Sequence, residues 1–140
     1  MPEPLNTPIH DIRRIDPAVG CYFVRWLRPL TADGYHVFLD DLLSRPDFRA
    51  EMCSLHDYRG IAAAPTMTDL KRAARATIAG AARRGPSRAA ILVDNDLNHG
   101  LARIYAAEVD SDNIERAVFR KPESALLWLG LPPDYPLPFD

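Results

Sequence analysis

Long apolar runs, signal-like segments and cysteines are scarce in this 140-residue chain, and each scarcity excludes a class of protein. No stretch approaches the roughly 20 consecutive apolar residues that cross a bilayer, so stable membrane insertion is not expected. The amino terminus, Met1-Pro2-Glu3-Pro4, lacks the basic and apolar regions of a secretory signal. A cytoplasmic protein is therefore the expectation.

Only two cysteines are present, Cys21 and Cys53, and they belong to no Cys-x-x-Cys or similar redox spacing. Both lie in apolar, strand-like runs, where a free thiol behaves as a small core side chain. A disulfide framework is therefore not expected.

Positive and negative charges are nearly balanced. The net charge of -2 provides no overall electrostatic reason to bind nucleic acid or anionic lipid. An apolar fraction of 47% and a charged fraction of 26% are ordinary for a globular protein. The length suits a single domain over residues 1–140, with a loose lead-in at residues 1–8 and a proline-rich tail at residues 132–140.

Catalytic motifs are missing as well. The chain contains no Gly-x-Ser-x-Gly elbow, no P-loop and no Gly-x-Gly-x-x-Gly fingerprint. A binding module is therefore expected rather than an enzyme, and no cofactor or metal is implied.

What the chain does contain is an alternation of strand-like and helix-like patterns, opened by a hairpin around the turn sequence Asp16-Pro17-Ala18-Val19-Gly20. The expected strands are residues 9–15, 21–27, 49–58, 89–93 and 114–120. The expected helices follow Thr31 to about residue 44, Thr66 or Thr68 to residue 84, the cap Asp94-Asn95-Asp96 to residue 107, and Pro122 to residue 130. This order predicts an α/β domain with a mixed, mainly parallel sheet of about five strands and four helices.

Helical spacing separates inward from outward positions on these helices. Ile78, Leu97 and Ile104 are expected to face the sheet. The second helix receives a basic outer face from five residues: Lys71, Arg72, Arg75, Arg83 and Arg84. Most such faces are simply solvated, and without interleaved aromatic residues nucleic-acid binding is not expected. Lys71, Arg72 and Arg75 form the candidate partner surface.

The strongest candidate for a small site is Asp94, Asn95, Asp96 and His99, which follow a buried parallel strand. Open α/β sheets place ligands at this end of their strands, and oxygen side chains there can hold a divalent cation. The same residues can instead act as plain helix caps. Two other pairs are weaker. His36 and Asp40 read as a solvated pair, and Cys53 and His56, three apart on a strand, point to opposite faces.

Thr66 and Thr68 stand at the start of a helix, where unpaired N–H groups and the helix dipole favour an anion. Either is a candidate phosphate acceptor or part of a ligand-binding loop. The unmodified hydroxyls also serve as ordinary caps, which is the simpler interpretation.

Three short segments carry a resemblance to a known family. They are Leu30-Thr31-Ala32-Asp33, Gly100-Leu101-Ala102-Arg103-Ile104-Tyr105, and Ala117-Val118-Phe119 with Ala125-Leu126-Leu127-Trp128-Leu129. They resemble the first helix junction, the helix after the fourth strand, and the closing strand and helix of bacterial STAS-like proteins. These are the relatives of the sporulation anti-sigma-factor antagonist, the SpoIIAA-like group. The resemblance covers residues 9–131.

The resemblance implies a non-enzymatic regulatory module that binds a protein partner, in some members under control of phosphorylation at the start of the second helix. Antagonists carry an Asp-Ser-Ser-Gly-like turn there, whereas residues 62–68 of this chain read Ala-Ala-Ala-Pro-Thr-Met-Thr and lack that serine. The SEC14-type lipid binders share the architecture, so a small-ligand or lipid carrier is the alternative. A metal-dependent hydrolase or phosphotransfer enzyme using Asp94, Asp96 and His99 is a third reading, and a homodimer stays open.

Overall fold

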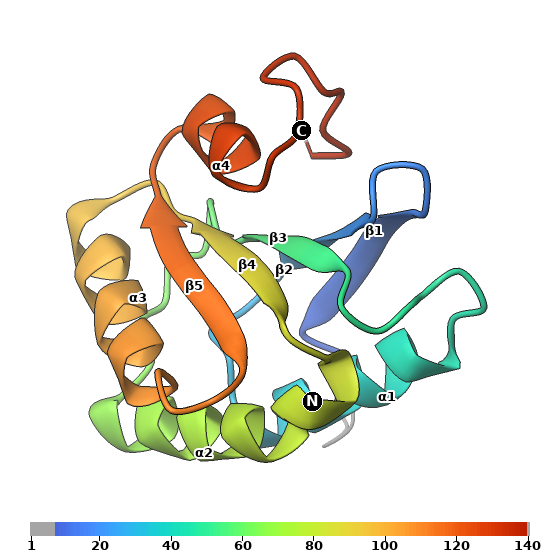
Figure 1. Cartoon of the computed structure of the whole chain (residues 1–140). Coiled ribbons are helices and arrows are strands. Elements are labelled where there is room, and N and C mark those ends of the chain that lie inside the picture. Colours follow the sequence, from blue (N-terminus) through green and yellow to red (C-terminus); the bar gives the residue numbers. More distant parts are fainter. Residues whose placement is uncertain (1–7, 140) are drawn as a thin grey trace.

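The computed structural model describes residues 8–139, so the predicted lead-in lies outside the described residues except for Pro8, as does Asp140 of the tail. The strands are β1 His10–Asp16, β2 Cys21–Trp26, β3 Cys53–Asp57, β4 Ser87–Leu92 and β5 Ile114–Phe119. The helices are α1 Ala32–Ser44, α2 Met67–Arg84, α3 Asp96–Glu108 and α4 Pro122–Trp128. The predicted fold class, an α/β domain with a mixed and mostly parallel sheet, is confirmed (Figure 1).

The third strand is shorter than predicted. A turn at residues 50–51 delays it until Cys53, and Glu51 adopts a φ of 75° in that turn. The turn directs the Glu51 N–H to the carbonyl of Arg84 at 2.9 Å, which provides one of the last carbonyls of α2 with a donor. The strand prediction failed at residues 49–52 because the backbone there turns and hydrogen-bonds to the end of a helix and not to a neighbouring strand.

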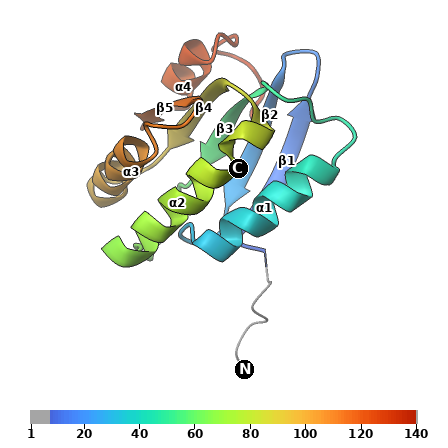
Figure 2. The same ribbon diagram turned by 60° about the horizontal axis from the view of Figure 1, so that its bottom comes forward.

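The five strands lie side by side in chain order, with β1 antiparallel to β2 and the other three pairs parallel. Each parallel connection moves one strand along in the same direction. Because such crossovers are right-handed, all three connecting helices fall on the same face of the sheet. Figures 1 and 2 show α1, α2 and α3 on that face and α4 with the C-terminal segment on the other.

The alternation of side chains along β2 shows how both faces become buried. Tyr22, Val24 and Trp26 pack in the cluster beneath α1. Cys21 and Phe23 point the other way, into the cluster formed with α4 and the C-terminal segment. The central strands are therefore covered on both sides, which explains the apolar runs of β2 and of the second half of β4.

The proline-rich tail packs on the body of the protein. The Tyr135 ring stacks on Phe23 with centroids 5.3 Å apart, and its hydroxyl donates to Asp16 at 2.6 Å. The Phe139 ring meets Phe23 edge-on at 6.4 Å. The expectation that the tail packs is confirmed, since aromatic side chains can bury area without regular backbone.

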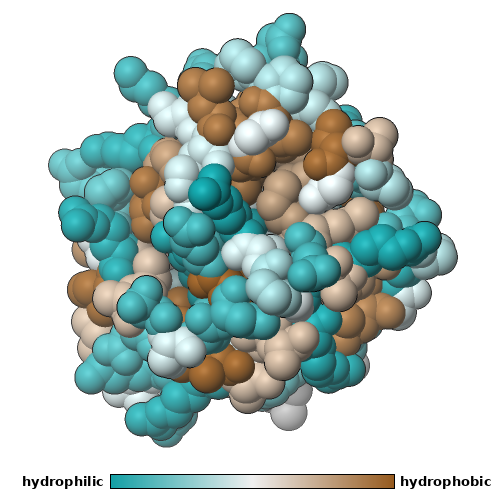
Figure 3. All heavy atoms as spheres, viewed as in Figure 1, coloured by the Kyte–Doolittle hydropathy of each residue, from teal (hydrophilic) through white to brown (hydrophobic). Residues whose placement is uncertain are grey.

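Three of the expected inward side chains are exposed instead: Ile78 by 36%, Leu97 by 62% and Ile104 by 39%. None of the residues of α3 is fully buried. The reason is its position at the end of the helical layer, where α2 flanks it on one side only (Figure 2). Seen as in Figure 1, the surface mixes hydrophilic and apolar residues, with apolar ones concentrated over α4 and the C-terminal segment (Figure 3).

Among the described residues, no helix combines the length and the apolar character that crossing a bilayer requires.

Two helical glycines offer a matched test of this packing. A Cβ at Gly80 of α2 would lie 2.7 Å from Leu39 Cδ2 and 2.9 Å from Tyr35 Cε1, whereas a Cβ at Gly100 of α3 would meet nothing within 4 Å. We expect Gly100→Ala to stabilise the protein by about 1 kcal/mol through helix propensity. Gly80→Ala should not gain stability, because overpacking costs about 1–3 kcal/mol and so cancels or exceeds the same gain in helix propensity. Urea denaturation of both variants measures the difference, and a stabilised Gly80→Ala would contradict the close α1–α2 packing.

Candidate functional site

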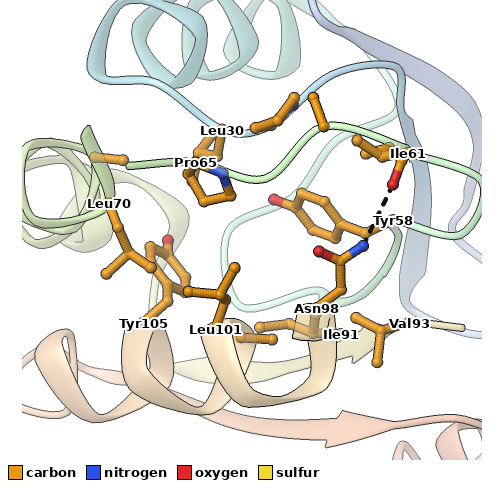
Figure 4. A pocket seen from close by; sticks show the side chains of 14 residues that line it. Leu30, Tyr58, Ile61, Pro65, Leu70, Ile91, Val93, Asn98, Leu101 and Tyr105 are labelled. Atoms are coloured by element: carbon orange, nitrogen blue, oxygen red, sulfur yellow. Dashed lines mark hydrogen bonds between the residues drawn. The ribbon is translucent and has the colours of Figure 1, made fainter. Parts of the chain in front are cut away.

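A cleft with a volume of about 80 Å³ opens at the carboxyl edge of the parallel strands (Figure 4). It lies between the loops that follow β2 and β3, the first turns of α2, and the inner side of α3. Leu30, Pro65, Leu70 and Leu101 form apolar walls, and the Tyr58 ring lies between them (Figure 4). An apolar hollow with few polar groups is the usual form of a small-molecule site.

Hydrogen bonds between separate segments hold this cleft open. The Gly60 N–H donates to Asp94 Oδ2 at 2.9 Å, which joins the β3–α2 loop to the end of β4. The Asn98 side-chain amide donates to the Ile61 carbonyl at 3.4 Å, which joins the same loop to α3. The Gly60 φ of 81° suits glycine at this bend. The cleft is therefore formed by the fold itself.

Small side chains provide the room. Ala73 of α2 and Ala102 of α3 both line the cleft. A leucine or isoleucine at either position would occupy the space, because α2 and α3 approach each other here over β4. The alanine-rich sequence of α2 thus permits both close packing on α1 and a cleft on its other side.

A second cavity of about 20 Å³, here called the inner chamber, lies between the sheet and the helices and shares Leu30, Tyr58, Ile91 and Tyr105 with the cleft. About 10–15 Å³ suffices for one water, so the chamber can hold a small polar group. Its wall includes two arginines, Arg84 and Arg116, and a histidine, His56. Such a polar lining is unusual for the interior of a small domain.

Arg84 is 4% exposed although it ends α2. Its Nε donates to the Tyr22 hydroxyl at 3.2 Å, and its guanidinium lies 5.8 Å from the Phe38 ring centroid. Arginine stays protonated in proteins, so this is a full buried positive charge. Within residues 8–139 no carboxylate forms an ion pair with it.

Arg116 enters the chamber from β5 and is neutralised. Its Nη1 donates to Asp112 Oδ1 at 2.9 Å and to the Ile114 carbonyl at 3.1 Å, and both charged side chains are almost completely buried. Its Nη2 finds no hydrogen-bond partner among the described residues. The pair therefore adds no net charge, and within residues 8–139 it leaves one donor and one acceptor, Asp112 Oδ2, unused.

His56 of β3 is neutral. Its Nδ1 accepts a hydrogen bond from Trp26 Nε1 at 3.1 Å, so the ring proton sits on Nε2 and is donated to Ser54 Oγ at 2.9 Å. Burial, followed by the charges of Arg84 and Arg116, lowers the pKa of His56 well below its usual value. Burial likewise raises the pKa of Tyr58 and Tyr105, which stay protonated at neutral pH.

Asp94, Asn95 and Asp96 are committed to structural bonds. Asp94 holds the Gly60 loop, Asn95 caps α3 through a bond from the Asn98 N–H, and Asp96 pairs with Arg120. His99 follows within α3 and does not line the cleft. Within residues 8–139, no three histidine, cysteine or carboxylate side chains form a group that could hold a metal ion.

Thr66 is the N-cap of α2, and its hydroxyl accepts from the Asp69 N–H at 3.1 Å. Thr68 is exposed in the first helical turn. Neither lines the cleft, whereas their neighbours Pro65 and Ala63 do. The predicted ligand-binding loop therefore contacts the cleft through its apolar residues.

Lys71, Arg72 and Arg75 are exposed, as expected. The placement of Arg84 on this outer face was wrong. Arg84 continues the inward row of Ala73, Thr77 and Ala81 at helical spacing, so the period could have revealed it. The residue type favoured the outer face, because an arginine at a helix end is normally solvated.

His36 and Asp40 are both exposed on α1. Cys53 and His56 point to opposite faces of β3, as predicted, because Cys53 belongs to the α4 side and His56 to the α1 side. Cys53 instead pairs in register with Cys21 of β2, and both thiols are free. A hydrogen bond from the Cys21 thiol lowers the pKa of Cys53.

Comparison of the chain with family models, with characterised proteins and with solved structures finds no match. The site is therefore interpreted from its own geometry.

The neutral His56 predicts a pH dependence of stability. Below about pH 6.5 this histidine takes up a proton in the unfolded chain but not in the folded protein. The unfolded state then binds more protons, so stability falls with falling pH, by up to about 1.4 kcal/mol for each pH unit. We expect urea denaturation between pH 7 and 5 to show a shallower loss for His56→Asn, which keeps an acceptor for Trp26. Parallel curves for the two proteins would contradict a neutral, buried His56.

Proposed function

We propose that this protein is a non-enzymatic module that binds a small, largely apolar molecule in the cleft at the carboxyl edge of its sheet. The observation that supports this most is the cleft itself, which is apolar and is held open by the Gly60–Asp94 and Asn98–Ile61 hydrogen bonds. A hollow stabilised by its own framework is ready to receive a ligand without a large rearrangement.

The lining favours binding over chemistry. In the part of the chain that the structure describes, no carboxylate, histidine, cysteine, serine, threonine or lysine faces the cleft. Its polar groups are the Asn98 amide and the hydroxyls of Tyr58 and Tyr105. Such groups orient a ligand by hydrogen bonds, and none is an activated nucleophile.

The relation to the STAS-like group also remains a proposal, supported by the hairpin and the four-helix order that the resemblance implies. Within that reading, the loop at residues 60–68 has two roles. It forms one wall of the cleft, and it borders the basic surface of Lys71, Arg72 and Arg75. Occupancy of the cleft can thereby change the surface that a partner meets.

Filling the cleft tests ligand binding directly. Ala102→Trp places an indole on the side of α3 that lines the cleft, whereas Ala107→Trp places the same group at an exposed position of the same helix. We expect native mass spectrometry of wild-type protein from its own host, after incubation with a lipid extract of that host, to show an added small-molecule mass. That mass should persist in Ala107→Trp and disappear in Ala102→Trp. A bare wild-type mass, or equal added mass in both variants, would contradict the proposal.

A protein partner is the second candidate, favoured by one observation. Lys71, Arg72 and Arg75 are exposed along α2, and none of them forms an ion pair within the described residues. Exposed cations without an ion-pair partner attract an acidic protein surface and raise the rate at which the two proteins associate.

Neutralising that surface provides the test. Alanine at Lys71, Arg72 and Arg75 together should remove partners that wild-type protein captures from native lysate at low salt, since the contacts are electrostatic. Arg103→Ala, an exposed cation on α3, serves as the control and should retain them. Identical partners for all three proteins would exclude this surface.

A further inference from the structure

The inner chamber holds a positive charge that the described part of the protein does not neutralise. Arg84 has no ion-pair partner there, Arg116 is already paired with Asp112, and His56 is neutral. The C-terminus of α2 contributes only about half a negative charge, and its influence is confined to the last turn. Buried charges in proteins are almost always paired, because the low-dielectric interior makes an isolated one costly.

Two donors in the chamber wall are incompletely used. The Tyr35 hydroxyl faces the Arg84 guanidinium, but its own O–H has no acceptor among the described residues. Arg116 Nη2 likewise has no partner there, and neither has Asp112 Oδ2 of the same ion pair. Tyr35 is 2% exposed and the Arg116 side chain 4%. Both can donate, as can Arg84, and no carboxylate is among the described residues that line the chamber to accept from them.

Size restricts what can supply that acceptor. The chamber is smaller than the cleft, about 20 Å³ against about 80 Å³, so a group that enters it must be compact. A carboxylate is planar, has two oxygens and binds guanidinium groups well, whereas a phosphate monoester is a bulkier, tetrahedral group. The geometry therefore favours a carboxylate.

The chamber adjoins the cleft, since Leu30, Tyr58, Ile91 and Tyr105 line both. Leu70 of the cleft and Arg84 of the chamber belong to the same helix, and their positions are about 21 Å apart along its axis. Helical side chains point back toward the N-terminus, so Arg84 reaches toward the cleft. An elongated ligand can therefore contact both regions.

We propose that the ligand is an elongated amphipathic monocarboxylate, with its carboxylate in the inner chamber against Arg84, Tyr35 and Arg116 Nη2 and its apolar chain in the cleft. This inference rests on the proposed function, because it names the chemistry of the molecule that the cleft binds. The carboxylate supplies the missing negative charge and accepts hydrogen bonds from the unused donors.

Head-group exchange at constant chain length tests this. Isothermal titration calorimetry at pH 7 compares octanoate with 1-octanol and octyl phosphate, and hexanoate and decanoate show the preferred length. We expect wild-type protein to bind octanoate at least tenfold more tightly than either eight-carbon analogue. Arg84→Met should lower octanoate affinity at least tenfold and leave 1-octanol affinity unchanged.

Tyr35→Phe removes a single hydroxyl and keeps the ring, so it tests the chamber even where Arg84→Met does not fold. It should lower the affinity for octanoate several-fold without changing the affinity for 1-octanol.

Equal binding of octanoate and 1-octanol by the wild type overturns the carboxylate assignment while the proposed function stands. Octyl phosphate binding as tightly as octanoate overturns the size argument. Failure of every acid and alcohol to bind overturns the proposal, and the co-purified mass of the cleft experiment then decides separately whether the cleft binds any ligand.

Discussion

The handedness of the three parallel crossovers is the constraint on which the rest of this structure depends. Each connection advances the sheet by one strand in the same direction, so right-handed crossovers place α1, α2 and α3 on one face. The strand order of this sheet does not reverse, so the sheet lacks the crevice in which doubly wound sheets bind ligands. The cleft arises instead where α2 and α3 pass over the carboxyl edge, and the loops that follow β2 and β3 close it.

The same constraint leaves the opposite face with little helix to cover it. The short α4 and the C-terminal segment do this together, and Tyr135 stacked on Phe23 replaces the contacts that a further helix would make. Arg14 extends this arrangement, since its guanidinium donates to the Pro136 carbonyl at 2.6 Å. The irregular tail is therefore part of the core, and the proline content that prevents regular structure does not prevent burial.

The two faces differ in chemistry. The α4 face is closed by apolar and aromatic packing, whereas the face beneath α1 and α2 contains Arg84, Arg116 and His56 among tyrosines. A protein that needed only stability would gain from apolar residues in their place, because desolvated ions contribute little net stabilisation. A ligand in the neighbouring cleft would supply the charge and the hydrogen bonds that the chamber lacks. The proposed function therefore accounts for the charged side chains of the chamber.

The sequence alone determined the elements and their order. Thr31, Thr66 and the cap before α3 mark helix starts because capping is a local property of a few neighbouring residues. It also indicated the packing of the tail and the exposure of Lys71. The site was decided only by tertiary structure. Arg84 lies against Tyr22 of β2 and Phe38 of α1, which are 62 and 46 positions earlier in the chain. Sheet register and crossover handedness bring them together. Periodicity assigns a side chain to a face, but only the assembled layers decide whether that face meets water or a buried chamber.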